Sequence, residues 1–559
     1  MVDEQFDVCV VGSGAGGAPV ACLLAEAGLK VLLLERGPNR RHRDFYVDEK
    51  RNLTGDFWRP HVNLHRHVLY QPGIGRTELT NSTIPATCVG GGTVQMAAYF
   101  HRMHADDLRM RSVHGELAGA NVADWPFDYS ELSPFYTKVA RLIGISGTDG
   151  RNPYAPPGDG DGSLPPLANH PIAERIEQAC TGLGLHPFKS SMAILPVEHD
   201  GRAPCFYCRF CANYGCPTKS KGSTAVTFVR KALASGNCEL RTACFVFRIE
   251  LDRHGHAGRV HYISKGGSRH AAGAKLVCLA CSAIETARLL LLSATPTQPN
   301  GLANSSGQLG RNLMFSAHSD VSAFVRFGEA TDPLRNKNHF VLRSIQDFYR
   351  LPHPHWPDGQ VPHPAGGTIS FYAPADNIAA KAKRVAQVQG SQPLWGRDLK
   401  EAIRTRLRDS YMFGFETFGE FLPNEQTRVA LSSNYKDQWG FPIAHVTVRP
   451  HPATRASNHY LTARGIEILQ AMEIDREDIV EHSIGSINPV LIYGTCRAGD
   501  DRTTAVLNRW CRSHDVPNLF VTDGSFMPTS GGVPGTFTIM ANALRVAEHI
   551  RDEELARLL

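Results

Sequence analysis

The sequence lacks long apolar runs and any recognisable targeting signal. No stretch reaches the roughly 18–20 consecutive apolar residues that cross a lipid bilayer. The opening residues, MVDEQFDVCVVGSG, carry acidic side chains where a secretion signal has a basic segment followed by a long apolar core. We therefore expect no membrane span and a cytoplasmic location.

A large excess of one charge sign is also absent. The 559 residues include 59 Lys and Arg and 54 Asp and Glu, for a formal net charge of +5. A charge this small over such a length does not indicate nucleic-acid binding, so the expected partner is a small-molecule substrate. A chain of this length exceeds one ordinary hydrophobic core, and two or more domains are expected. The oligomeric state cannot be predicted.

The 14 cysteines and 25 histidines need separate interpretations. Without a secretion signal, the cysteines do not indicate a disulfide framework. The histidine cluster in LHRH (64–67) is interpreted as a solvated loop rather than a metal site.

The segment FDVCVVGSGAGGAPVACLLAEAGLKVLLLERG (6–37) predicts a strand, a glycine turn, a helix and a second strand. Gly12, Gly14 and Gly17 have the G-x-G-x-x-G spacing that lets a pyrophosphate approach the backbone and lets helix and strand pack closely. Glu35 ends the second strand, where it can accept a hydrogen bond from a ribose hydroxyl. An acid there disfavours a 2′-phosphate, so FAD and NAD remain as candidate cofactors.

Further motifs occur along the whole chain, in a fixed order. They are the second glycine run CVGGGTVQMAAYFHRM (88–103), DWPFDYSELSPFYTKVARLIGISG (124–147), LVCLACSAIETARLLLLS (276–293), LGRNLM (309–314), FLPNEQTRVALSSNYKDQWGFPI (421–443) and NLFVTDGSFMPTSGGVPGTFTIMANALRVAEHI (518–550). In this order and spacing, the chain from residue 6 to about 550 resembles the glucose–methanol–choline (GMC) flavin oxidoreductases. It is most similar to the bacterial branch of gluconate dehydrogenase-like and aminoglycoside-biosynthetic dehydrogenases.

The resemblance implies an α/β fold, with an FAD-binding Rossmann-type domain interleaved with a substrate domain on an antiparallel sheet. The FAD-binding domain is expected to comprise residues 1–95, 225–320 and 485–559. The substrate domain and a cysteine loop would comprise 96–224 and 321–484. Local patterns agree, because TRVALSS and IAHVTVRP alternate like strands around the turn KDQWGFP.

The expected cofactor contacts follow in part from the residues and in part from the resemblance. The backbone of Gly91, Gly92 and Thr93 in the second glycine run can lie against a cofactor. The resemblance implies that Val246 lies near the adenine and that Asp523 contacts the flavin ribityl or pyrophosphate. Some relatives tether FAD through a histidine where this chain has Gln95. Since glutamine cannot form that bond, we predict non-covalent FAD.

The catalytic pair of the family is replaced. Its base is a histidine three residues before a Gly-Thr pair, and here Leu491 precedes Gly494 and Thr495 at that distance. The second member, Asn or His, lies in a pattern resembling GG-x-N-P-T, where this chain has Pro534. Leu491 and Pro534 are therefore expected in the substrate pocket, without proton-transfer chemistry.

Several interpretations of this loss remain open. Tyr493 could act as the base or orient the substrate, although an unperturbed tyrosine pKa near 10 makes a poor base. The substrate could need little help from a base. A redox-neutral lyase or photodecarboxylase, or a flavin-bound non-catalytic subunit, is the alternative outside alcohol oxidation. Finally, a histidine could come from elsewhere, for instance His318 or His482.

In the apolar run YMFGFETFGEF, Glu416 and Glu420 are spaced to share one face of a strand. A buried Glu416 in the substrate pocket would suit a cationic amino-sugar group, whereas an outward-facing pair would only be solvated.

We predict an FAD-dependent oxidoreductase. It would transfer hydride from a small polar hydroxyl- or amine-bearing metabolite, sugar-like or aminoglycoside-like, to flavin N5.

One loop is rich in thiols. Its cysteines follow the spacing C-x2-C-x2-C-x4-C-P and are Cys205, Cys208, Cys211 and Cys216. Four thiolates so close together can hold an iron–sulfur cluster or zinc. The other interpretation is a thiol-rich structural loop without metal.

Overall fold

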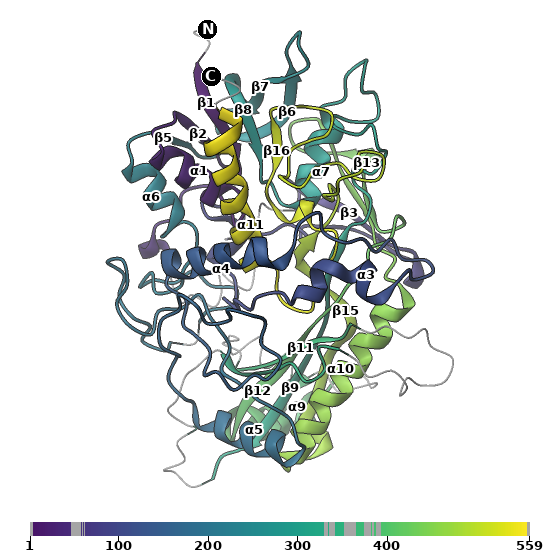
Figure 1. The fold of residues 1–559 in the computed structure, drawn as a ribbon. Coiled ribbons are helices and arrows are strands. Elements are labelled where there is room, and N and C mark those ends of the chain that lie inside the picture. The colour runs from purple at the N-terminus through teal and green to yellow at the C-terminus, as the bar shows by residue number, and fades with distance from the viewer. Residues whose placement is uncertain are drawn as a thin grey trace.

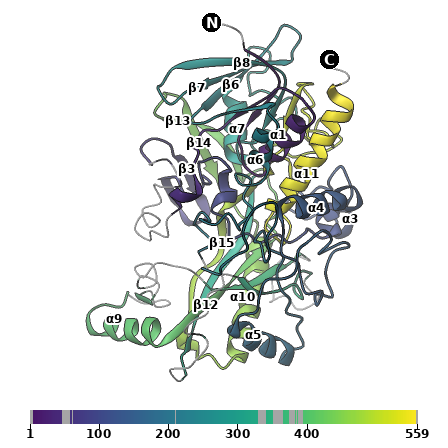
Figure 2. The same ribbon diagram turned by 90° about the vertical axis from the view of Figure 1, so that its left-hand side faces the viewer.

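The computed structural model describes residues 4–45, 62–208, 210–328, 341–350, 365–373 and 393–555, with a few isolated residues in the gaps. Three β-sheets organise these residues. Figures 1 and 2 show one sheet with its helices in the upper half of the molecule and a second sheet in the lower half. None of the helices in the described ranges is both long and apolar enough to cross a bilayer.

The first sheet is the nucleotide-binding type that the N-terminal motif predicts. Its order is β5-β2-β1-β8-β7-β6, with β16 paired to β8. β5, β2, β1, β8 and β16 pair in parallel, and β6 and β7 extend the sheet antiparallel. The strands are β1 (Gln5–Val11), β2 (Val31–Leu34), β5 (Cys238–Arg241), β6 (Phe245–Leu251), β7 (Ala257–Ile263), β8 (Arg269–Leu279) and β16 (Leu519–Val521). Segments from three distant parts of the chain thus share one sheet, which confirms the Rossmann-type α/β class.

Helices pack around this sheet because its parallel strands are apolar on both faces. α1 lies between α6 and α11, and α7 contacts β6. Their bounds are α1 (Gly17–Glu26), α6 (Phe228–Ala234), α7 (Ala283–Leu292) and α11 (Thr536–His549). α4 packs on α11 and bridges toward the lower half of the molecule (Figure 1). The other helices are α3 (Met110–His114), α4 (Tyr129–Ile143), α5 (Pro171–Gly182), α9 (Gly396–Ile403) and α10 (Pro452–Ala471).

The second sheet is antiparallel throughout, in the order β10-β11-β12-β9-β15. Its strands are β9 (Met314–Arg326), β10 (Val341–Ile345), β11 (Gly367–Tyr372), β12 (Ser410–Gly419) and β15 (Ile479–Tyr493). α10 packs on one face and contacts α5 in turn. The antiparallel sheet expected from the family resemblance is therefore present.

A bulge interrupts the pairing of β15 with β9. Asn488 pairs with Ser316 and Ile492 with Phe315, so residues 489–491 have no partner of their own on β9. A bulge of this kind turns side chains away from the regular ladder. Leu491 lies in this bulge, near the end of the strand that leads to Gly494.

A third sheet, β13-β14-β3-β4, joins the N-terminal region to the predicted hairpin. β13 (Arg428–Lys436) and β14 (Pro442–Thr447) pair antiparallel on either side of the predicted turn, as the alternation of the sequence indicates. β3 (His67–Gln71) and β4 (Arg76–Thr80) complete the sheet.

The predicted domain boundaries fall within two long strands. The boundary at 320/321 lies inside β9, and the boundary at 484/485 lies inside β15. Both strands run continuously from the lower sheet toward the nucleotide-binding half (Figures 1 and 2). The division of the chain into two interleaved domains stays a prediction.

Candidate active site

One cavity of about 750 Å³ connects the two halves of the molecule. At one end it is lined by the glycine turn after β1 and by Glu35 at the end of β2. At the other end it reaches the face of the antiparallel sheet, where β9, β11 and β12 contribute side chains. A cavity that joins a dinucleotide turn to a polar sheet face is suited to hold a cofactor and a substrate together.

The glycine turn is shaped by close backbone contacts. Gly12 has φ +100°, and a Cβ there would lie 2.2 Å from the carbonyl oxygen of Ala280. A Cβ on Gly17 would lie 1.9 Å from the carbonyl oxygen of Gly12. A Cβ on Gly14 would lie 4.0 Å from Cα of Gly91, so the two glycine runs meet at this point. Side chains are excluded where a pyrophosphate would approach the start of α1.

Ser13 joins the two glycine runs to the acid after β2. Its hydroxyl donates to Oε2 of Glu35 at 2.7 Å and accepts the backbone N–H of Gly90 at 2.9 Å. Oε1 of Glu35 accepts the N–H of Gly37 at 2.8 Å. In the second run, the Thr93 hydroxyl donates to the Gly90 carbonyl oxygen. Glu35 thus lines the cavity and at the same time fixes the turn.

The remaining expected cofactor residues also reach the cavity. Gly91, Gly92, Val246 and Asp523 line it. Oε1 of Gln95, which also lines it, is buried and has no hydrogen-bond partner among the described residues. A buried orphan acceptor of this kind calls for a donor from a bound molecule.

Asp523 is buried and held in place by two hydroxyl groups. One carboxylate oxygen accepts from Thr286 at 2.5 Å, and the other accepts from both the backbone and the hydroxyl of Ser525. Burial raises the pKa of this carboxyl despite these hydrogen bonds. Its side chain thus fixes the start of the segment that ends at Phe526, beside the glycine turn.

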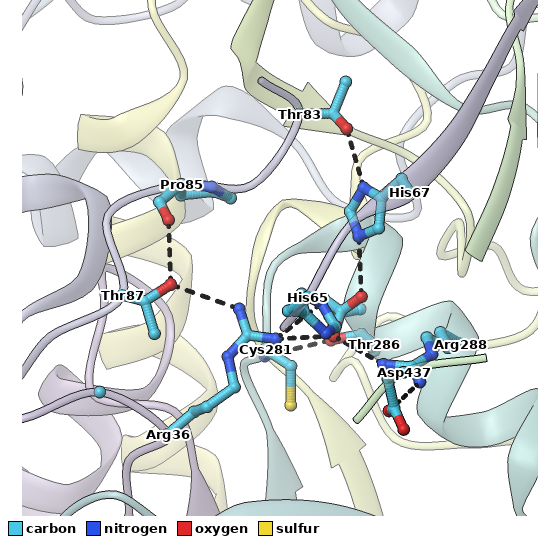
Figure 3. Close-up of polar contacts among 12 residues, drawn as sticks. Arg36, His65, His67, Thr83, Pro85, Thr87, Cys281, Thr286, Arg288 and Asp437 are labelled. Carbon is cyan, nitrogen blue, oxygen red and sulfur yellow. Dashed lines mark hydrogen bonds and ion pairs between the residues drawn. The ribbon is translucent and has the colours of Figure 1, made fainter. Parts of the chain in front are cut away.

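Near Glu35, a buried ionic cluster centres on the carboxylate of Glu285. Arg36 donates to Oε2 of Glu285 at 2.9 Å, and Nε2 of His67 lies 2.9 Å from Oε1. Nε2 of His65 lies 3.2 Å from Oε2, and Arg288 approaches the same oxygen at 3.4 Å. Figure 3 shows these arginine and histidine side chains converging from separate segments. The interpretation of the LHRH stretch as a solvated loop is wrong, because both histidines are buried.

The cluster is balanced without a metal ion. His65, His67 and Glu285 form the one group of three or more potential metal ligands found in the described residues. Burial opposes ionisation of Glu285, but contacts with His65 and Arg288 hold its pKa well below the usual value. Burial lowers the pKa of His65 to about 4, so this ring is neutral and the arginines supply the positive charge. Arg36 and Arg288 therefore occupy the place of a cation.

The replaced catalytic positions line the same cavity. Leu491, Pro534 and Tyr493 all line it. The Tyr493 hydroxyl accepts the backbone N–H of Gly535 at 2.9 Å, and burial raises its pKa above the ordinary tyrosine value. Arg497 supplies no compensating charge, because its guanidinium donates to the backbone carbonyls of Thr504 and Asn121. This environment favours an orienting hydroxyl over a base.

The antiparallel sheet presents a polar face to the same cavity. His318 and Asp320 on β9 line it, together with Tyr372 on β11 and Glu416 on β12. The Tyr372 hydroxyl donates to Oδ1 of Asp320 at 2.5 Å. His482 does not line the cavity, and its ring nitrogen lies 2.9 Å from the Ser322 hydroxyl.

Glu416 and Glu420 do not share this face. β12 ends at Gly419, so the alternation that predicted a common face stops before Glu420. Glu420 is fully buried, and Oε1 accepts the backbone N–H and the hydroxyl of Ser530 at 3.0 Å each. Its Oε2 has no partner among the described residues. Burial and then the charge of Asp107 raise the pKa of Glu420 to about 8.

The cysteine loop lies beside the cavity and contains free thiols. Cys205, Cys208, Cys211 and Cys216 are unpaired, and in the described ranges no three of their sulfur atoms lie within 4.8 Å of one another. Burial raises the pKa of Cys205 to about 11. The ammonium group of buried Lys221 donates to the carbonyl oxygens of Met96, Cys211 and Tyr214. These sulfur atoms are not grouped as the ligands of a tetrahedral zinc ion are, about 4 Å apart, and the metal-binding role of the loop stays a prediction.

Two family profiles, both described as GMC oxidoreductase, match residues 69–318 and 423–543, and an NAD(P)-binding Rossmann-like profile matches residues 10–40. The 6'''-hydroxyparomomycin C oxidase of Streptomyces lividus is 30% identical over 100% of this chain and 94% of its own length. The chain belongs to the GMC oxidoreductase family. The 2-methyl-1,2-propanediol dehydrogenase of Mycolicibacterium austroafricanum is 31% identical over 98% of this chain and 95% of its own. A solved structure of Aspergillus oryzae formate oxidase, a variant made to study FAD modification, has a TM-score of 0.65 at 15% identity and full coverage of both chains.

In this GMC oxidoreductase, the residues that sequence reasoning missed lie on the antiparallel sheet. Asp320 and Tyr372 line the cavity but belong to no motif. The alternation in MFSAHSDVSAF places His318 and Asp320 on one face of a strand, and this pattern could have predicted that Asp320 lies in the cavity with His318. Tyr372 could not have been found this way, because its contact with Asp320 joins residues 52 positions apart.

Proposed function

We propose that this GMC oxidoreductase binds FAD non-covalently and oxidises a hydroxyl group on a small polar metabolite that also carries an amine. The observation that carries this proposal is the continuous cavity. It has the dinucleotide turn at one end and the carboxylates of Asp320 and Glu416 at the other. A sugar-like or aminoglycoside-like substrate fits both the polarity and the charge of that end.

The residues of the cavity fit FAD. Gly12, Gly14 and Gly17 leave room for its pyrophosphate. The unpartnered Oε1 of Gln95 can accept a hydrogen bond from an N–H or hydroxyl group of the cofactor. Glu35 and Val246 line the end where the adenosine would lie. Gln95 has no nucleophilic nitrogen for a covalent link, which supports non-covalent binding. FAD, when bound, supplies the acceptor for the hydride.

The polar face of the sheet supports recognition of an ammonium group. The carboxylates of Asp320 and Glu416 are partly buried, so their attraction for a cation is screened less than at the surface. The hydrogen bond from Tyr372 holds Asp320 in place. The relative named for 6'''-hydroxyparomomycin C supports an amine-bearing substrate, whereas the relative named for a neutral diol supports only the oxidation of a hydroxyl group.

The middle of the cavity excludes water and orients the substrate. Leu491 and Pro534 present apolar surface there, where the family has proton-transfer groups. Tyr493 fixes the following loop through Gly535, and its own proton remains available to a substrate oxygen. We therefore assign Tyr493 an orienting role rather than that of the base.

We interpret the cysteine loop as structural. Asn213 and Tyr214, within the loop, line the cavity, and the three carbonyl contacts of Lys221 hold the loop against Met96. Without a metal ion, burial raises the pKa of Cys205 and Cys211, so both thiols are protonated in this loop. A purified protein without iron would agree with this interpretation.

The test is an anaerobic visible spectrum of the purified holoenzyme before and after substrate is added. The panel contains paromamine, 2-methyl-1,2-propanediol, D-fructose and D-gluconate. We expect paromamine to bleach the flavin bands at the lowest concentration. Bleaching by the neutral diol alone would remove the ammonium part of the proposal.

The replacement of both catalytic residues also favours a second function. Leu491 and Pro534 cannot transfer protons. A site without these proton-transfer groups would suit a redox-neutral flavin lyase, a photodecarboxylase or a flavin-bound non-catalytic subunit. In those cases the bands would persist with every panel member, while dithionite would still reduce them.

A further inference from the structure

Among the described residues, His318 is the one histidine whose side chain lines the cavity. His65 and His67 are engaged with Glu285 at the nucleotide end. His482 is hydrogen-bonded to Ser322, outside the cavity lining. His318 is therefore the candidate for the proton acceptor that the family has at the position of Leu491.

The hydrogen bonding of His318 leaves one ring nitrogen available. Nδ1 lies 3.3 Å from the backbone carbonyl oxygen of Thr417 and 3.9 Å from a carboxylate oxygen of Glu416. Both oxygens accept, so Nδ1 carries the proton in the neutral ring and Nε2 has the lone pair. No described residue forms a hydrogen bond to Nε2.

The strand register places this histidine on β9, next to the strand that carries the vacated position. His318 pairs with Ser486 across the β9–β15 ladder, and Ser316 pairs with Asn488, where the bulge begins. The bulge carries Leu491 into the same cavity that His318 lines. The imidazole on β9 and the position that holds the family's histidine therefore line one cavity.

The surroundings prepare His318 to gain a proton. Burial lowers its pKa, which keeps the ring neutral before the reaction, while the charge of Asp320 acts in the opposite direction. Four ionisable groups line the cavity near it: Asp320 on its own strand, Glu416 on β12, Tyr372 on β11 and Tyr99. The two carboxylates would stabilise an imidazolium once it forms.

We propose that His318 is the general base of this enzyme, and that Nε2 takes the proton of the reacting hydroxyl group. With FAD bound, the C–H bond of that carbon would break, its electron pair would leave as hydride to FAD, and the C–O bond would become a carbonyl. The imidazolium of His318 then transfers the proton to solvent or to a neighbouring carboxylate. The proposal rests on the proposed function, because it needs a hydroxyl substrate.

The test compares His318→Asn with His482→Asn, a matched change on the adjoining strand outside the cavity. Flavin reduction is followed by anaerobic stopped-flow, with the panel substrate that reduces the wild type fastest. The limiting rate of His318→Asn should fall about 10²–10⁴-fold at neutral pH, the usual contribution of a general base, with the dissociation constant of the substrate nearly unchanged. Imidazole added to the buffer should restore part of the rate, and His482→Asn should behave as wild type.

A second measurement does not depend on turnover. Diethyl pyrocarbonate modifies neutral imidazoles, and peptide mass spectrometry reports modification at His318 and at His482 in the same holoenzyme. We expect His318 to react with a pH midpoint below 6.5 and to be protected by the substrate, while His482 is not protected. Protection of neither residue would overturn the proposal.

The outcomes separate the two proposals. If no panel member reduces the wild-type flavin, the proposed function and the base fall together. If the wild type is reduced and His318→Asn keeps its rate within twofold, the function stands and the assignment of His318 is overturned. If Tyr493→Phe alone loses the rate, the base is Tyr493.

Discussion

The phenolic oxygen of Tyr493 lies 2.9 Å from the backbone nitrogen of Gly535 and accepts its hydrogen bond. The contact links the end of β15 to the segment that carries Pro534, so the two replaced catalytic positions are held at a fixed separation. A Cβ on Gly535 would lie 2.6 Å from the tyrosine ring, which shows how closely the two segments pack.

We expect Tyr493→Phe to lower the free energy of unfolding by about 1–3 kcal/mol, because it leaves a buried N–H without an acceptor. Urea denaturation checks this value, with exposed Tyr435→Phe as the control. An orienting role predicts at most about a tenfold loss in the rate of flavin reduction, well short of a general base's usual contribution. A larger loss that varies with pH would instead support the base interpretation.

Asp320→Asn should weaken binding of an amine-bearing substrate about 10–100-fold, since a hydrogen bond to a charged group is lost. Asparagine keeps an oxygen that can accept from Tyr372, so the sheet face should retain its shape. The KM for the neutral diol of the panel should not change. An equal loss of affinity for the amine-bearing substrate and for the diol would mean that the carboxylate of Asp320 has a structural role.

Glu420→Gln should flatten the pH dependence of stability. The pKa of Glu420 in the folded state, about 8, lies above the ordinary value of 4.5, so the folded state holds the proton more tightly. The contribution of Glu420 to the free energy of unfolding is therefore fully present below pH 4.5 and is lost as the pH rises through 8. Asp107, whose pKa is raised to about 7, contributes in the same direction. Between pH 5 and pH 8, the variant should lose at least about 1 kcal/mol less of its free energy of unfolding than the wild type. Parallel pH profiles would contradict burial of this acid.

Glu285→Gln should lower the free energy of unfolding by about 3–5 kcal/mol, the usual cost of removing one partner from a buried ionic cluster. Glu78→Gln, in an exposed pair with Arg76, is the control and should cost no more than about 1 kcal/mol. A metal chelator should leave the melting temperature unchanged, because Arg36 and Arg288 occupy the carboxylate. A lower melting temperature with the chelator would point to a bound metal ion.

The nucleotide-binding half could be predicted because its determinants are local. The glycine spacing and the flanking strands lie within 32 residues, and the β13–β14 hairpin lies within 20. The ionic cluster could not be predicted, since the contact between Arg36 and Glu285 joins residues 249 positions apart. The face of Glu420 was predicted wrongly because β12 ends at Gly419, one residue earlier, and Glu420 instead forms a hydrogen bond with Ser530, 110 positions away.

His318 and Asp320 leave the same face of one strand two residues apart. Successive side chains on such a face are spaced about 6.6 Å apart, and a β-strand keeps this spacing rigidly. If one residue takes the hydroxyl proton and the other holds the ammonium group, the strand acts as a ruler. A metabolite whose amine and reacting hydroxyl lie on opposite sides of a single sugar ring matches its length, whereas a compound with adjacent groups meets one side chain and misses the other.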